Sequence, residues 1–357
     1  MELWRLVSSS ARRAAGWASA AEANGWHGIG VTDSQNLAGD SWVALTAMAG
    51  ATEQIKLGTA VTNPVTRHPA VTASAAMSLA QLAGDRVTIG IGRGDSALAH
   101  LGRAPASVDA LEHYLQTLRT YLRGKPVAFD DLGFSEATAP DVATLNMSDT
   151  PEHSRIVWRR DDDPLVTVEV AATGPKVIGA AARSADRIIF ALGAATDRLA
   201  WGIDTAKSAR RAAGLDPDDI EFGAYLNMVP HSDIDVARQI IAGSLSTFAR
   251  FSVMHGSVTG PADDELRDTL KGVHANYDMK KHTRTDSSQA SSMPSEFIDR
   301  FGIVGTPDQC IERLTEIEAL GITKAIVIGP SAGSDRAHAR EAQQLTVDEV
   351  IPAMATS

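Results

Sequence analysis

Small and polar residues follow two neighbouring β-like runs of this sequence, in a pattern that suits close approach to a ligand. The run at 55–61 leads into a Thr-Asn-Pro turn, and the run at 86–91 leads into a glycine-rich turn that ends at Asp95. Active sites of parallel α/β proteins lie at the C-terminal ends of the strands. We therefore expect both turns to contact a ligand. Their candidate binding residues are Ala60, Val61, Thr62, Asn63, Gly92 and Arg93.

A third turn, after the run at 165–170, is suited to an anion. Residues 172–176 read Ala-Thr-Gly-Pro-Lys. Glycine allows close backbone approach, threonine supplies a hydroxyl, and the free N–H groups at a helix start attract negative charge. The alternative interpretation is an ordinary turn with proline at the first helical position. The candidate binding residues are Thr173, Gly174, Pro175 and Lys176.

One carboxylate, Asp33, directly follows the short run at 28–31 and its threonine. At the C-terminal edge of a sheet it could orient a cofactor ring or exchange a proton with a substrate. Asp33 is therefore the candidate catalytic residue. The alternative interpretation is that Asp33 caps the following helix.

Other kinds of chemistry have less support. A nicotinamide-binding Rossmann pattern requires a third glycine where this chain has Asp95, and no acidic residue is placed to bind a ribose. We predict neither a metal site nor a catalytic triad, and the sequence contains no HExxH and no Cys/His cluster. Two stretches, 248–255 and 277–282, combine aromatic residues, Met and His and are candidates for a substrate lid.

Eight β-like runs alternate with Ala-rich helical segments, and this alternation predicts the framework for the turns. Apolar strands with helical crossovers imply a parallel sheet that is covered on both faces. We expect residues 1–357 to form a single domain, a (β/α)8 TIM barrel with insertions at 127–163 and 255–294, rather than an open doubly wound sheet. The predicted strands are 3–7, 28–31, 55–61, 86–91, 165–170, 187–190, 220–228 and 322–328.

The bulk composition limits the compartment and the partners. A net charge of −11 argues against a nucleic-acid partner and against an anionic membrane surface. Cys310 is the single cysteine, so an intrachain disulfide is impossible. The sequence has no long apolar run and no apolar leader. We expect a cytoplasmic homodimer that acts on a small-molecule substrate.

Four segments of this sequence resemble the bacterial-luciferase-like superfamily of (β/α)8 barrels. They read VTDSQNLAGDSWVAL, LGTAVTNPVTRHPAVTA, GIGRGDSA and AATGPKVIGAAARSADRIIF. The VTNPxTRxP and GxGxGD patterns look most like the branch typified by methylene-tetrahydromethanopterin reductase. This resemblance implies an oxidoreductase that transfers a hydride between deazaflavin coenzyme F-420 and a small organic substrate. Two alternatives stay open: an FMN-dependent monooxygenase with a separate reductase, and a flavin or deazaflavin binding protein without turnover.

The resemblance also implies roles for individual residues. Members often have a non-prolyl cis peptide bond that backs the central ring of the cofactor, and by motif position this would be Ala60–Val61. The turn at 172–176 corresponds to a phosphate site, and the loop at Gly193 to a second contact with the cofactor tail. Many relatives carry a histidine directly after the acid that corresponds to Asp33. This chain has Ser34 there, so a histidine-based acid–base role is absent at that position.

Overall fold

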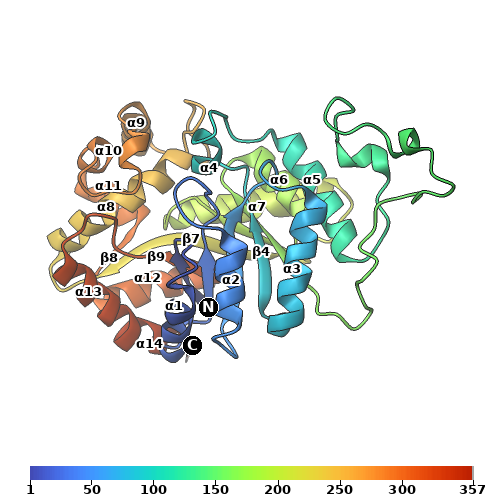
Figure 1. The fold of residues 1–357 in the computed structure, drawn as a ribbon. Helices are drawn as coiled ribbons and strands as arrows, with labels where there is room; N and C mark the ends of the chain where they lie inside the picture. Colours follow the sequence, from blue (N-terminus) through green and yellow to red (C-terminus); the bar gives the residue numbers. More distant parts are fainter. Residues whose placement is uncertain (356–357) are drawn as a thin grey trace.

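Eight parallel strands close into a barrel, and helices cover its outer face (Figure 1). The computed structural model describes residues 1–355. Strands pair in the order β1 to β7, then β9, and β9 pairs again with β1. The expected (β/α)8 TIM barrel is therefore confirmed, and an open sheet is excluded. The strands are β1 (Glu2–Val7), β2 (Gly28–Val31), β3 (Lys56–Thr62), β4 (Val87–Ile91), β5 (Thr167–Ala172), β6 (Arg187–Phe190), β7 (Glu221–Pro230), β8 (Ile303–Gly305) and β9 (Ile322–Ile328).

Strand β8 is the one strand that the sequence does not predict. Its three residues pair with the last three residues of β7, Met228–Pro230. Strand β7 has ten residues. Its last three residues extend beyond its pairing with β6, so their backbone groups are available to β8. The eight predicted strands agree with the barrel strands to within two residues at each end.

Several helices begin at a local side-chain cap. Asp40 accepts the N–H of Trp42 at 2.9 Å and begins α2. Thr306 and Gln309 form a reciprocal capping box at the start of α12. The helices are α1 (Ala14–Ala23), α2 (Ser41–Ala49), α3 (Pro69–Ala83), α4 (Ser96–Ala99), α5 (Val108–Leu122), α6 (Pro175–Ser184), α7 (Thr196–Ala212), α8 (Ile234–Phe251), α9 (Asp264–Ala275), α10 (Ser288–Ser291), α11 (Ser295–Phe301), α12 (Pro307–Ala319), α13 (Arg336–Leu345) and α14 (Ile351–Ala355). Among residues 1–355, no helix is long and apolar enough to cross a membrane.

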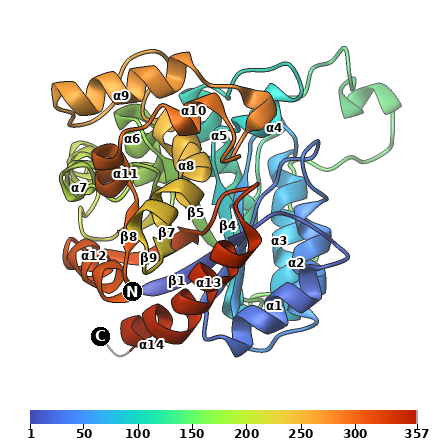
Figure 2. The ribbon, with the colours of Figure 1, turned by 90° about the vertical axis from the view of Figure 1, so that its left-hand side faces the viewer.

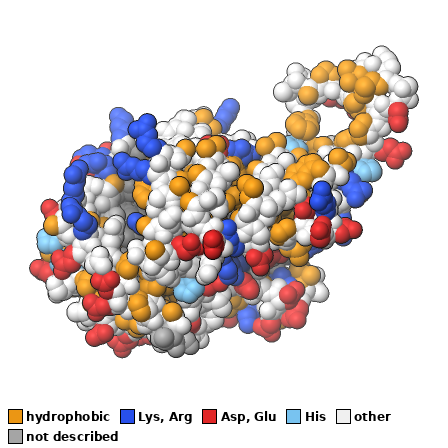
Figure 3. Space-filling model, turned by 60° about the horizontal axis from the view of Figure 1, so that its bottom comes forward, with side chains coloured by type: hydrophobic (Ala, Val, Ile, Leu, Met, Phe, Trp, Pro, Cys, Tyr) orange, Lys and Arg blue, Asp and Glu red, His pale blue; other side chains and the backbone are white. Residues whose placement is uncertain are grey.

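The two irregular stretches differ in structure. Residues 127–163 contain only short 3₁₀ turns and include a lobe that projects from the barrel, with apolar side chains on its surface (Figure 3). The expectation of an irregular stretch at 255–294 is wrong in part, because α9 lies within it. Asp263 caps α9, and the buried side chains of Leu266 and Leu270 hold it against the rest of the molecule. Helices α8 to α11 form a second layer at one side of the barrel (Figure 2).

Charged side chains fill part of the barrel interior. Glu169 of β5 and Lys324 of β9 are almost fully buried, and Lys324 Nζ lies 2.8 and 2.7 Å from the two carboxylate oxygens. Arg187 of β6 also pairs with Glu169. The ring of Trp4 covers the ammonium group at 3.2 Å. Glu169 and Lys324 are each the third residue of their strands, so this group lies toward the N-terminal end of the barrel.

Candidate active site

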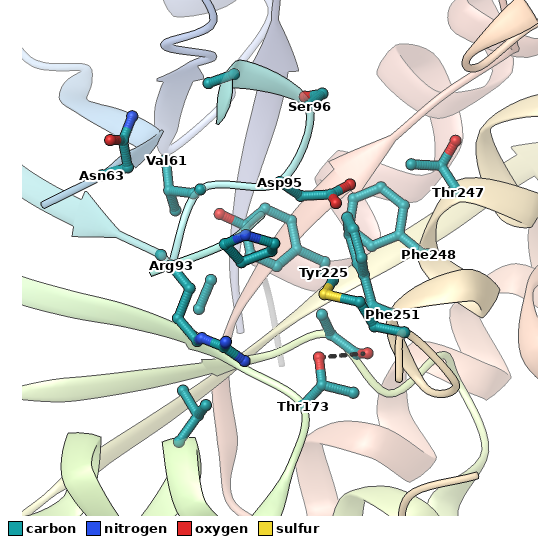
Figure 4. Close-up of a pocket in the computed structure, with 18 of the residues that line it drawn as sticks. Val61, Asn63, Arg93, Asp95, Ser96, Thr173, Tyr225, Thr247, Phe248 and Phe251 are labelled. Carbon is teal, nitrogen blue, oxygen red and sulfur yellow. Dashed lines mark hydrogen bonds between the residues drawn. The ribbon is translucent and has the colours of Figure 1, made fainter. Parts of the chain in front are cut away.

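A cavity of about 410 Å³ opens at the C-terminal ends of the barrel strands. The strand ends supply one wall, and α8 with the chain that follows it supplies the other (Figure 4). Of the residues predicted to form a site, those that line the cavity are Asp33, Ala60, Val61, Asn63, Gly92, Arg93, Thr173 and Gly174. Thr62, Pro175, Lys176 and Gly193 do not line it.

The end of β3 gives the cavity a wall of small side chains. The Ala60–Val61 peptide bond is cis, as the resemblance implies. Across from it, a Cβ atom on Gly92 would lie 2.9 Å from the side chain of Val61, so only glycine fits at position 92. Asn63 holds the turn through its Oδ1, which accepts two backbone N–H groups at 3.0 Å. Its buried Nδ2 has no hydrogen-bond partner among the described residues.

The end of β5 forms an open cradle at the start of α6. Thr173 donates its hydroxyl to the carbonyl oxygen of Ala191 at 3.4 Å. A Cβ atom on Gly174 would meet only one atom within 4 Å, the Cγ2 of Thr259 at 3.8 Å. Pro175 and Lys176 are exposed outside the cradle.

Two residues that the sequence predicts to bind the cofactor, Gly193 and Thr62, are packed against other parts of the protein outside the cavity. Gly193 has a φ of +78°, and a Cβ atom there would lie 2.7 Å from the ring of Phe301. Thr62 is fully buried behind the β3 wall. The glycine at 193 is therefore explained by the loop geometry and the packing of Phe301.

Asp33 is a buried carboxylate that faces the cavity. Its side chain belongs to a residue that is 7 % exposed, and its Oδ2 has no hydrogen-bond partner among residues 1–355. The alternative interpretation as a helix cap is wrong, because Asp40 caps α2. A buried polar atom without a partner is costly, so Oδ2 is placed to accept a hydrogen bond from a bound molecule.

Basic and acidic side chains lie at the end of β4. Arg93 donates from Nε to the carbonyl oxygen of Ala106 at 2.5 Å and lies 3.4 Å from the ring of His255. Burial lowers the pKa of Arg93. Asp95 forms an ion pair with Arg250 of α8. These contacts join the two walls of the cavity.

The wall opposite the small side chains is largely apolar. Tyr225 of β7 points into the cavity beside Phe248 and Phe251 of α8 (Figure 4). The rings of Tyr225 and Phe248 are 5.4 Å apart, and so are those of Phe248 and Phe251. Burial raises the pKa of Tyr225. Met254, His255 and His282 complete this wall, so both stretches that the sequence suggests as a lid reach the cavity.

A cluster of three possible metal ligands lies outside the cavity. Nε2 of His231 is 3.1 Å from Nδ1 of His338 and 3.3 Å from a carboxylate oxygen of Glu341. However, Nδ1 of His231 accepts the backbone N–H of Asp233 at 2.9 Å. This bond places the ring proton on Nε2, which makes His231 a hydrogen-bond donor in the cluster rather than a metal ligand.

The sequence of this chain matches the model of the luciferase-like monooxygenase family over residues 3–324, and the chain belongs to this family. It is 27 % identical over 351 residues to a 5,10-methylenetetrahydromethanopterin reductase of Archaeoglobus fulgidus, which covers 93 % of this chain and 92 % of the relative.

Solved structures agree with this assignment. The coenzyme F420-dependent tetrahydromethanopterin reductase of Methanopyrus kandleri matches with a TM-score of 0.73 at 21 % identity, over 98 % of both chains. An F420-dependent secondary alcohol dehydrogenase in complex with an F420–acetone adduct matches with a TM-score of 0.70 at 20 % identity, over 99 % of this chain and 98 % of the other. The resemblance to the superfamily and to its F420-dependent branch is thus confirmed.

Proposed function

We propose that this protein is an oxidoreductase that transfers a hydride between coenzyme F-420 and a small organic substrate. The observation that carries the proposal is one cavity that combines a small-residue wall, an open cradle at a helix start and a buried carboxylate without a partner. The similarity to reductases of this cofactor supports the same assignment.

The residues of the cavity fit a deazaflavin. The wall at Ala60, Val61 and Gly92 leaves room for a flat ring, and Asp33 Oδ2 can accept a ring N–H. The cradle at Thr173 and Gly174 lies at the start of the ten-residue helix α6, where free N–H groups attract a phosphate. When bound, the deazaflavin would supply or accept the hydride. Aromatic side chains of the opposite wall exclude water from the reacting atoms.

The tail of the cofactor distinguishes F-420 from FMN. F-420 continues beyond its phosphate into an acidic chain, which needs basic residues near the mouth of the cavity. Arg93 lines the cavity, and Lys176 is exposed beside the cradle. The second candidate function is an FMN-dependent monooxygenase with a separate reductase, and the description of the matching family favours it.

Titration of the purified protein with F-420 and with FMN, followed by fluorescence, tests the proposal. We expect F-420 to bind with a Kd in the micromolar range or tighter, about −8 kcal/mol or better, and FMN to bind more weakly. FMN that co-purifies in a one-to-one ratio and is not displaced by F-420 would establish the monooxygenase assignment instead.

Gly174→Val is expected to weaken cofactor binding without unfolding the barrel. The cradle has space for a side chain, but a β-branched group there would block a phosphate from the backbone N–H groups. The same titration measures the change in Kd. Gly16→Val is the matched control, because a Cβ atom on Gly16 of α1 also meets open space. Equal Kd values for the two variants would place the phosphate elsewhere.

We also propose that the chain is one domain with two insertions and that it works in the cytoplasm as a homodimer. Val43 of α2 and the α3 residues Val71 and Leu82 are more than half exposed, on two helices that contact each other, and exposed apolar patches favour an interface. Cys310 is a buried free thiol, which suits a reducing compartment.

A further inference from the structure

Reduction of a carbonyl group needs a proton as well as a hydride, and few groups in the cavity can supply one. Asp95 is already paired with Arg250. Asp33 is assigned to the cofactor ring, whose N–H its unpartnered Oδ2 would accept. Arg93 is held by the carbonyl oxygen of Ala106. Tyr225 and His255 also line the cavity, but burial raises the pKa of Tyr225, and Nε2 of His255 lies 3.4 Å from Arg93. His282 is the candidate with a chain of hydrogen bonds behind it.

His282 lies at the cavity end of a hydrogen-bonded chain that begins on α8. The Oγ1 of Thr247 is 3.0 Å from the hydroxyl of Tyr277, and that hydroxyl is 2.7 Å from Nδ1 of His282. His282 and Thr247 both line the cavity. None of the hydrogen bonds found within residues 1–355 involves Nε2 of His282, so this nitrogen is free to contact a substrate.

Arg250 places a positive charge beside the hydrogen-bonded residues Tyr277 and His282. Its guanidinium group lies 4.5 Å from the centre of the Tyr277 ring. Burial raises the pKa of Tyr277, and the cation opposes that rise by favouring negative charge on the tyrosine oxygen. Burial lowers the pKa of His282 to about 4, and the nearby charges of Arg250 and His100 act in the same direction. The imidazole is therefore neutral at pH 7.

The hydrogen bond from Tyr277 decides which nitrogen carries the proton. A neutral imidazole has one N–H and one acceptor nitrogen. When the Tyr277 hydroxyl donates to Nδ1, the proton of His282 must be on Nε2. The ring then presents an N–H donor to the cavity, and Tyr277 stands behind it as a second donor.

We propose that His282 donates the proton to the substrate oxygen when a carbonyl compound is reduced in this cavity, and that Tyr277 replaces that proton through Nδ1. The inference rests on the proposed function. The carbonyl carbon receives the hydride, with its electron pair, from the reduced deazaflavin. The oxygen takes the Nε2 proton while Nδ1 takes the Tyr277 proton. To restore the starting state, Nε2 takes a proton from water and Nδ1 returns its proton to Tyr277. In alcohol oxidation every transfer runs in reverse.

The ring state of His282 can be measured on the protein without cofactor. In ¹⁵N NMR of imidazole-labelled protein, the His282 signals, assigned by their loss in His282→Gln, are expected to report a proton on Nε2 and none on Nδ1. They should titrate with a pKa of about 4. A proton on Nδ1 and none on Nε2 at pH 7 would overturn the proposal.

Single-turnover hydride transfer gives the second readout. His282→Gln is expected to lower the rate by on the order of a hundredfold, with the Kd for F-420 within about twofold of wild type, since His282 is assigned to the substrate side. Tyr277→Phe keeps the ring and removes the donor, and should lower the rate by about tenfold while moving the His282 tautomer. His153→Gln is the control, because His153 is an exposed residue outside the cavity.

The outcomes separate this inference from the proposed function. If wild-type protein does not bind F-420, the proposed function fails, and the proton-donor role fails with it. If wild-type protein transfers the hydride and folded His282→Gln transfers it equally fast, only the role of His282 is wrong. If His282→Gln folds poorly, the His282 signals are assigned instead by their shift in Tyr277→Phe, which removes the hydroxyl beside Nδ1.

Discussion

Glu169→Gln is expected to lower the free energy of unfolding by about 3–5 kcal/mol. Glu169 is the shared carboxylate of two cations inside the barrel, Lys324 and Arg187. Glutamine keeps the shape of the side chain but removes the negative charge. The ammonium group of Lys324, which is fully buried, would then face a second cation without compensation. Urea unfolding followed by circular dichroism measures the loss.

Two other variants test whether the burial of Glu169 causes the expected loss in the free energy of unfolding. Glu221→Gln removes the second carboxylate bound to Arg187, but the Glu221 side chain is 60 % exposed, so a loss below about 1 kcal/mol is expected. Lys324→Met should cost less than Glu169→Gln, because Glu169 would keep Arg187 as a partner. Equal losses for Glu169→Gln and Glu221→Gln would contradict this account of the barrel interior.

Asp33→Asn is expected to raise the Kd for F-420 by about 10- to 100-fold. The basis is the loss of a hydrogen bond to a charged acceptor, worth about 1.5–3 kcal/mol. The same substitution should stabilise the cofactor-free protein, because Oδ2 is buried there without a partner and a neutral amide is less costly to bury. Fluorescence titration measures the Kd, and thermal unfolding measures the stability.

The division of the effect between binding and turnover identifies the role of Asp33. If the Kd is kept and turnover at saturation falls by on the order of a hundredfold, Asp33 exchanges a proton during the reaction. If neither quantity changes in a folded variant, the assignment of Asp33 to the site is wrong. Asp130→Asn is the matched control, since Asp130 is exposed in the projecting stretch at 127–163.

The barrel could be predicted because its signals are local. Each strand is a short β-like run, and several turns between elements carry their own cap, such as Ser107 at the start of α5 and Thr306 at the start of α12. Strand β8 could not be found in this way. Three residues contain too little periodicity, and Ile303–Gly305 becomes a strand only because β7 extends far enough to pair with it.

The sequence of helix α9 has apolar residues at helical spacing, but the residues on either side of it favour irregular structure. Leu266, Leu270 and Val273 follow helical spacing after the cap residue Asp263. The neighbouring stretches contain Gly, Pro, Ser and charged residues, which favour an irregular segment over the whole of 255–294. The helix forms because its apolar face is buried against the layer that contains α8.

The two walls of the cavity were predictable to different degrees. The strand-end wall follows from the rule that parallel strands place their C-terminal ends together, and most of its predicted residues line the cavity. The opposite wall depends on how the second layer sits on the barrel. The pairing of Asp95 with Arg250 joins residues 155 positions apart, and nothing in either segment alone indicates the other.

The long strand β7 has a consequence for how the cavity can vary. Between β7 and α12 the chain leaves the barrel, builds the layer of α8 to α11 around its own apolar cluster, and returns through β8. Phe248, Phe251 and His282 belong to this excursion, while Tyr225, the small-residue wall and the cradle belong to the barrel strands or their ends. Under the proposed function, substitutions within one continuous stretch, residues 231–305, would change the substrate side of the cavity and leave the strand ends that are proposed to hold the cofactor unaltered.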